Sequence, residues 1–98
     1  MKIQLNGEVL KAEVMDTPQK RATGMMGREE LDGVMVFPFG EPGERSFWMK
    51  GCLIPLDIYF VVNSKVTKVH KNCEPCTIDD CESYTGIADT VIEISSTN

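Results

Sequence analysis

A chain of 98 residues is long enough for one domain with a single modest core, which we expect to span residues 1–98. Hydrophobic residues make up 42% of the chain and charged residues 26%, proportions typical of a globular protein that dissolves in water. The formal net charge of −5 argues against a general nucleic-acid-binding protein, because binding to phosphates requires a basic surface.

No segment approaches the roughly 20 apolar residues that a membrane helix needs, so we expect no membrane association. The first residues, 1–7, lack the apolar centre of a signal peptide and continue directly into a strand pattern. A cytoplasmic location is therefore the expectation, and a mature secreted form whose signal peptide has been removed is the alternative.

The N-terminal third predicts a hairpin followed by a helix. Apolar and polar residues alternate around Asn6-Gly7, a strong signal for a two-residue turn, so we expect a hairpin over residues 2–15. Asp16-Thr17-Pro18 is typical of a helix start, because Asp or Thr caps free backbone N–H groups and Pro suits the first turn. The helix is expected to reach about Met26, with a buried stripe formed by Ala22, Met25 and Met26.

The rest of the chain has an extended pattern. A short apolar strand at 34–37 is expected to stop at Pro38 and a Gly-rich turn at 40–43. Further strands are predicted at about 45–50, 56–62, 65–70 and 87–95, with an irregular Cys-bearing loop at 72–86. Many short strands and one helix indicate a mainly β (α+β) fold, a mostly antiparallel β-sandwich or barrel.

Residues 45–60 carry the candidate site. Because side chains alternate along a strand, we expect the core to contain Phe47, Met49, Ile58 and Phe60. The other face then collects Trp48, Lys50, Asp57 and Tyr59, which together offer an aromatic wall, a donor and an acceptor for a polar ligand. In the alternative interpretation, Lys50 and Asp57 form an ordinary cross-strand ion pair and Trp48 belongs to the core.

Asp57 lies inside an otherwise apolar strand. A buried carboxylate needs a partner or must be protonated, and we expect its counter-charge to come from Lys50, Arg45, Arg21 or Arg28. The pair Ile54-Pro55 restricts the backbone just before this strand, and its peptide bond is compatible with either the cis or the trans form.

Five motifs over about residues 15–94 resemble a known family. They are RATGMMGR at 21–28, LDGVMVF at 31–37, SFWMK at 46–50, IPLDIYF at 54–60, and Glu74-Pro75-Cys76 with Cys81 and Tyr84. On these motifs the chain resembles domain of unknown function 192, a family of bacteria, archaea and phages without an established activity. Family members often continue past the last strand with a Gly-rich stretch, whereas this chain stops at Asn98.

The resemblance implies a compact, mainly β fold of jelly-roll or sandwich type with one short helix packed on it. It maps a functional surface onto Arg21, Arg28, Trp48, Lys50 and Asp57. It also implies a pairing of Cys76 with Cys81, which as a disulfide would close a small loop.

The remaining cysteines and the single histidine leave alternatives open. His70, Cys73, Cys76 and Cys81 have a spacing that could hold zinc, although no second Cys-x-x-Cys pair is present. Cys73 and Cys76 could instead form a redox pair, but they lie in a Pro-bearing loop rather than at a helix start. We favour a loop disulfide or four thiols, with Cys52 and Cys73 free or bridged to each other and His70 solvated.

The leading hypothesis is a non-enzymatic domain without cofactor or metal that binds a small polar or anionic ligand. Its site residues are expected to be Arg21, Arg28, Trp48, Lys50, Asp57 and Tyr59. The alternative is a protein-interaction module that pairs through a sheet edge or an exposed apolar patch. Met25, Met26, Met35 and Met49 could form an adaptable surface for it, although methionines more often fill the core. A third hypothesis is a Cys-based metal or redox site.

Overall fold

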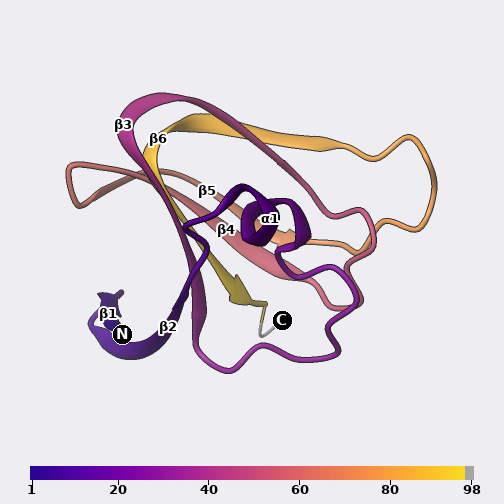
Figure 1. Ribbon diagram of the computed structural model, residues 1–98, viewed down its shortest axis with the longest axis horizontal. Helices are drawn as coiled ribbons and strands as arrows, with labels where there is room; N and C mark the ends of the chain where they lie inside the picture. Colours follow the sequence, from indigo (N-terminus) through magenta and orange to yellow (C-terminus); the bar gives the residue numbers. More distant parts are fainter. Residues whose placement is uncertain (97–98) are drawn as a thin grey trace.

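The computed structural model describes residues 1–96. Its elements are β1 (Lys2–Leu5), β2 (Glu8–Val14), α1 (Pro18–Thr23), β3 (Val34–Trp48), β4 (Leu56–Val62), β5 (Lys65–Cys73) and β6 (Ser83–Ser95). The strands form one six-stranded mixed sheet in the order β1-β2-β3-β6-β4-β5, and this sheet does not close into a barrel. In Figure 1, β3 and β6 bend together as a long curved pair, and α1 lies in front of β4 and β5. The expectation of a compact, mainly β domain with one short helix is confirmed.

The predicted N-terminal hairpin is confirmed. β1 and β2 pair antiparallel across Asn6 and Gly7, which both have positive φ, as the tight hairpin turn requires. β2 then pairs in parallel with β3, so the sheet is not wholly antiparallel. The segment between these two strands, which contains α1, is long enough to act as the crossover that a parallel pair needs.

The helix begins where the sequence predicts and ends earlier. The Thr17 hydroxyl accepts a hydrogen bond from the Lys20 backbone N–H at 3.1 Å, and Pro18 occupies the first turn. The helix ends at Gly24, whose φ is +45°, rather than near Met26. The predicted buried stripe is therefore wrong, because α1 itself buries no residue and Met26 is 42% exposed. Only Met25, in the turn after the helix, enters the core.

β3 continues through the segment where the sequence predicts a stop and a turn. The register against β6 shifts between Pro38 and Gly43, so the segment forms an irregularity within one strand. Arg45 stabilises this irregular segment through two hydrogen bonds. Its Nε donates to the Ala88 carbonyl at 3.1 Å, and its Nη2 donates to the Glu41 carbonyl at 2.7 Å. β5 and β6 are also longer than predicted, which reduces the Cys-bearing loop to residues 74–82.

Alternating residues build two separate hydrophobic clusters on the two faces of the sheet. The first contains Met35, Phe37, Leu56, Ile58, Phe60 and Val91, together with Met15, Met25 and Met49. The second contains Leu5, Val34, Val36, Tyr59, Val61 and Ile92. Of the four methionines considered for an adaptable surface, Met25, Met35 and Met49 are thus buried and only Met26 is exposed, so three of the four fill the core.

Two backbone features complete the description. The described peptide bonds are all trans, including the bond between Ile54 and Pro55. Within residues 1–96, no helix has the length and the apolar character needed to span a bilayer.

Candidate functional site

A pocket of about 420 Å³ opens on the face of the first cluster, between the helical segment and the curved strand β3. This volume lies within the range of small-molecule sites in proteins. Four parts of the chain line it: residues 21–26, residues 37–48 of β3, the turn at 50–52, and one residue of β6. The lining includes Arg21, Met25, Phe37, Phe39, Glu44, Arg45, Phe47, Trp48, Lys50, Cys52 and Glu93.

The mouth of the pocket combines cations with aromatic rings. The Arg45 guanidinium carbon lies 4.2 Å from the ring centre of Phe39, and the Arg21 guanidinium lies 6.0 Å from the same ring. Lys50 Nζ lies 5.5 Å from the ring centre of Trp48, which is 49% exposed. Because each cation rests on an aromatic face, its position at the mouth is favoured before any ligand binds.

A cluster of edge-to-face rings forms the wall of the pocket. The ring of Phe47 lies 5.0 Å from that of Phe37 and 6.3 Å from that of Phe39, at interplanar angles of 77° and 76°. Phe47 also contacts Phe60 in the core at 6.2 Å. Edge-to-face packing fixes the orientation of each ring, so the wall offers a preformed apolar surface to a ligand.

The inner end of the pocket carries an acid that the sequence analysis missed. Glu93 lies on β6 opposite Met35 and Ile58, on the face of the first cluster, and is only 4% exposed. Burial raises the pKa of its carboxyl to about 7. Burial, together with the negative charge of Glu93, also raises the pKa of the Cys52 thiol to about 11. The signal was present in the sequence, because Glu93 interrupts an apolar run in a predicted strand just as Asp57 does.

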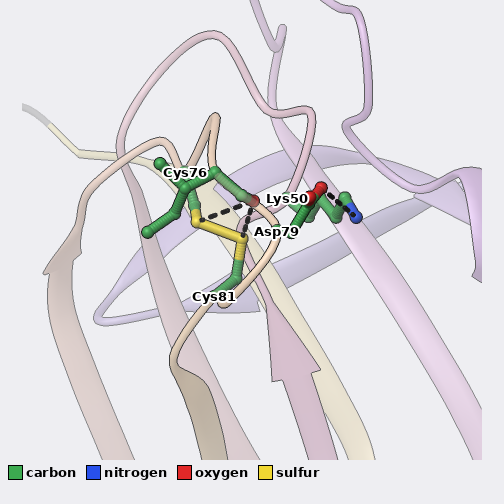
Figure 2. The surroundings of a disulfide bond; sticks show 5 residues. Lys50, Cys76, Asp79 and Cys81 are labelled. Carbon is green, nitrogen blue, oxygen red and sulfur yellow. Dashed lines mark hydrogen bonds and ion pairs between the residues drawn. A yellow bond between two sulfur atoms is a disulfide. The ribbon is translucent and has the colours of Figure 1, made fainter.

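Lys50 is positioned by the loop that carries the disulfide (Figure 2). The Cys76 N–H donates to the Met49 carbonyl at 3.2 Å, and the Gly51 N–H donates to the Cys76 carbonyl at 3.1 Å. Lys50 Nζ lies 3.7 Å from Oδ1 of Asp79, a fully exposed residue inside the disulfide-closed loop. An ion pair this exposed contributes little, so the backbone hydrogen bonds hold the turn.

The cysteines adopt the pairing that the family resemblance implies. Cys76 and Cys81 form a disulfide, which is incompatible with a zinc site that uses both sulfurs. Within residues 1–96, no group of three or more His, Cys, Asp or Glu side chains is arranged to hold a metal. Cys52 and Cys73 are free and buried, and burial raises the pKa of the Cys73 thiol to about 11, the opposite of a reactive redox thiol.

His70, which we expected to be solvated, is partly exposed and also makes contacts within the protein. Its Nε2–H donates to the Thr85 carbonyl at 3.0 Å. Its ring packs edge-on between Phe60, at 5.7 Å, and Tyr84, at 5.3 Å. The side chain therefore links β5 to β6 and has a structural role.

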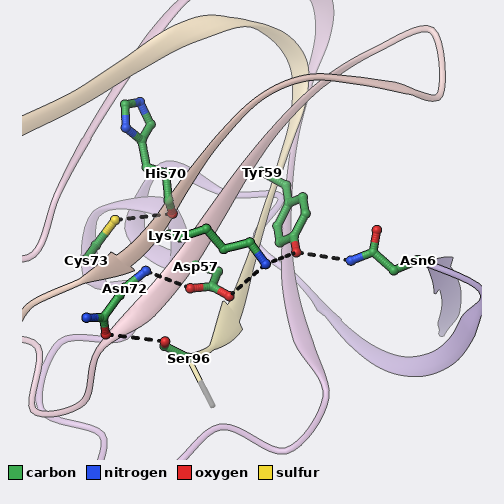
Figure 3. A network of polar contacts seen from close by, with 8 residues as sticks. All are labelled: Asn6, Asp57, Tyr59, His70, Lys71, Asn72, Cys73 and Ser96. Atoms are coloured by element: carbon green, nitrogen blue, oxygen red, sulfur yellow. Dashed lines mark hydrogen bonds and ion pairs between the residues drawn. The ribbon is translucent and has the colours of Figure 1, made fainter. Parts of the chain in front are cut away.

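Asp57 and Tyr59 belong to a network of polar contacts with Asn6, Lys71 and Asn72, which Figure 3 shows. This network lies on the face of the second cluster, away from the pocket. Asp57, 8% exposed, accepts a hydrogen bond from the Asn72 backbone N–H at 2.8 Å and lies 3.7 Å from Lys71 Nζ. The Tyr59 hydroxyl accepts hydrogen bonds from Asn6 at 3.1 Å and from Lys71 at 3.3 Å. The counter-charge of Asp57 is thus Lys71, and our expectation that Lys50 or an arginine supplies it is wrong.

The strand order explains this separation. β6 lies between β3 and β4, and on β6 the neighbour of Asp57 is Ile94, whereas the neighbour of Ile58 is Glu93. Ile58 and Glu93 therefore share the pocket face, and Asp57 points to the other one. Contrary to our expectation, Asp57 and Tyr59 therefore do not line a site together with Trp48 and Lys50.

Arg28 also lies outside the main pocket. Its Nη1 and Nη2 donate to the two carboxylate oxygens of Glu13 at 2.6 and 2.8 Å. Hydrogen bonding within this bidentate pair lowers the pKa of Glu13 and raises that of Arg28. The pair lines a second, smaller pocket of about 270 Å³. Of the predicted site residues, the structure brings together Arg21, Trp48 and Lys50 and adds Arg45 and Glu93.

Two solved structures are similar to this chain over most of its length. A protein of unknown function from Novosphingobium aromaticivorans DSM 12444 is 32% identical, with a TM-score of 0.79 over 91% of this chain and 65% of that one. A proposed transcription regulator from Sinorhizobium meliloti 1021 is 27% identical, with a TM-score of 0.78 over 97% of this chain and 77% of that one. The search of curated proteins gave no match.

The first of these structures is considerably longer than this chain, which spans 65% of it. The family model of DUF192, described as an uncharacterized ACR family, matches residues 1–97. That match covers nearly the whole sequence, including all five motifs of the resemblance and every residue that lines the pocket. The chain therefore belongs to the DUF192 family.

Proposed function

We propose that the protein binds a small ligand in the main pocket. The anionic group of this ligand would lie at the mouth, near Arg21, Arg45 and Lys50, and its apolar or aromatic body would lie against Phe47 and Trp48. The observation that carries the proposal is the gathering of three cationic side chains around one preformed aromatic wall.

The charges at the mouth favour an anion. The lining has three basic side chains and two acidic ones, Glu44 and Glu93, and Glu93 is buried at the inner end. Within residues 1–96, the Arg21 side chain makes one long hydrogen bond, to the Met15 carbonyl at 3.5 Å, which leaves most of its donors available to a ligand. Arg45 donates to backbone carbonyls, which orient its guanidinium without neutralising its charge. Guanidinium groups bind carboxylates and phosphates through paired hydrogen bonds.

The proposal is tested with 8-anilinonaphthalene-1-sulfonate, a probe that joins an aromatic body to an anion. Trp48 is the only tryptophan of the chain and lines the pocket, so binding is expected to produce saturable energy transfer from Trp48 to the probe. In two-dimensional NMR spectra, the shifted amide signals should cluster at residues 21–26 and 44–50.

Two variants with a matched control sharpen this test. Arg21→Ala is expected to raise the Kd of the probe about fivefold, since a partly exposed charge contact contributes about 1 kcal/mol. Arg28→Ala removes an arginine outside the pocket and should leave the Kd unchanged. Trp48→Ala should keep the fold, because the indole is half exposed, and should weaken binding measured by probe emission. Absence of binding, or equal effects of the two arginine variants, would refute the proposal.

Two expectations from the sequence, a protein partner and a cytoplasmic location, stay predictions. Three residues of the proposed site, Arg21, Trp48 and Lys50, were predicted from the sequence. The fold adds Arg45 to them. Asp57, Tyr59 and Arg28 are left out of it because each lies outside the main pocket and already has partners within the protein.

A further inference from the structure

The Glu93 carboxyl group lines the inner end of the main pocket. Among residues 1–96, no fully enclosed side-chain nitrogen or oxygen lacks a hydrogen bond, so the Glu93 oxygens remain accessible from the pocket. Within residues 1–96, no side-chain hydrogen bond and no ion pair to Glu93 is found, although the residue is only 4% exposed. The lining residues most buried with it are Met25, Phe37 and Cys52, which offer no charge to balance an ionised carboxylate. A buried ionised group normally has a charged or hydrogen-bonding partner, because leaving it alone is costly.

We propose that Glu93 binds a primary amine of the ligand. The ligand class would then be amphoteric: an anionic group at the mouth, an apolar or aromatic body along the wall, and an ammonium group at the inner end. This inference rests on the proposed function, because it assigns the inner end of the same pocket.

The placement of charge fixes the orientation of such a ligand. Arg21, Arg45 and Lys50 lie at the more exposed end and would repel an ammonium group, whereas they attract an anion. At the inner end an ammonium group would donate to the Glu93 carboxylate in a charge-assisted hydrogen bond, which is stronger than a neutral one. Phe37, which is buried, lines the same pocket, and an aromatic face also stabilises a cation.

Other roles for Glu93 fit the surroundings less well. A metal ion would need further ligands, but no such group is found within the described residues, and Cys52 holds its proton because burial raises the pKa of its thiol to about 11. A purely structural role would require a partner within the protein, as Asp57 has on the other face.

Three matched probes test the inference by calorimetry at pH 8. They are 3-(4-aminomethylphenyl)propanoate, which has both charges, 3-(4-methylphenyl)propanoate, which lacks the amine, and 4-methylbenzylamine, which lacks the acid. We expect the first probe to bind at least about tenfold more tightly than either of the others, because one charge-assisted hydrogen bond lowers the Kd by about this factor. In Glu93→Gln this preference over the methyl compound should disappear, while the methyl compound binds as before or more tightly.

The outcomes separate this inference from the function on which it rests. If the methyl compound binds in the pocket and the amine brings no gain in the wild-type protein, the inference fails and the proposed function stands. If none of the acids binds, both fail. The ratio within the wild-type protein is informative even if Glu93→Gln does not fold, and circular dichroism of that variant checks its folding.

Discussion

Glu93 makes a specific prediction about stability and pH. Burial raises the pKa of its carboxyl from 4.5 to about 7. The folded protein therefore holds this proton more tightly than the unfolded chain does. The tighter binding of this proton contributes to the free energy of unfolding. The contribution is fully present below pH 4.5, the pKa in the unfolded chain, and is lost as the pH rises through about 7, the pKa in the folded protein. At roughly 1.4 kcal/mol per pKa unit, the loss amounts to about 3 kcal/mol.

The Glu93→Gln variant isolates this contribution. Gln has nearly the same shape and does not titrate, so the variant should lack this one component of the pH dependence. Urea unfolding followed by circular dichroism, without reductant so that the disulfide stays closed, would give the free energy of unfolding at pH 4.5 and at pH 8. The other titrating groups contribute equally in the variant and in the wild type. Their contributions therefore cancel when one free energy of unfolding is subtracted from the other.

From pH 4.5 to pH 8, we expect the free energy of unfolding of the variant to increase by about 3 kcal/mol relative to that of the wild type. A constant difference across the range would refute the reasoning, because it would mean that the Glu93 carboxyl titrates alike in the folded and unfolded states. A carbon-detected NMR titration of the Glu93 carboxyl would give its pKa directly.

Two further substitutions test the packing and the assignment of the faces. Gly33→Ala should lower the free energy of unfolding by more than about 2 kcal/mol, because φ is +82° and the new Cβ would clash with the Lys11 carbonyl oxygen. Gly7→Ala is the control, because its φ is +81° but the space around it is open, and it should cost clearly less. An equal loss of stability in the two variants would contradict this reasoning. Asp57→Ala should cost about 1–3 kcal/mol, because it leaves the Asn72 N–H without its partner, and should leave probe binding in the main pocket unchanged. Loss of binding with unchanged stability would instead place Asp57 in the site.

The sequence by itself determined the features that depend on neighbouring residues. Asn6-Gly7 predicts its hairpin because both residues tolerate positive φ, and Thr17-Pro18 predicts a helix start because capping is a local interaction. The alternation of side chains likewise predicts Ile58 and Phe60 in the core. Arg21, Trp48 and Lys50, three of the predicted site residues, do line one pocket.

Only the tertiary structure decided which of these strands are neighbours and which face each polar residue occupies. β3 continues past Pro38 because an irregular register and Arg45 accommodate that segment, which no local pattern reveals. β6 lies between β3 and β4, and its register with β4 puts Glu93 on the pocket face and leaves Asp57 outside the pocket. Strand order and register bring together residues that are far apart in the chain. The surroundings of a buried charge therefore depend on contacts between strands, which the alternation of side chains along a single strand cannot predict.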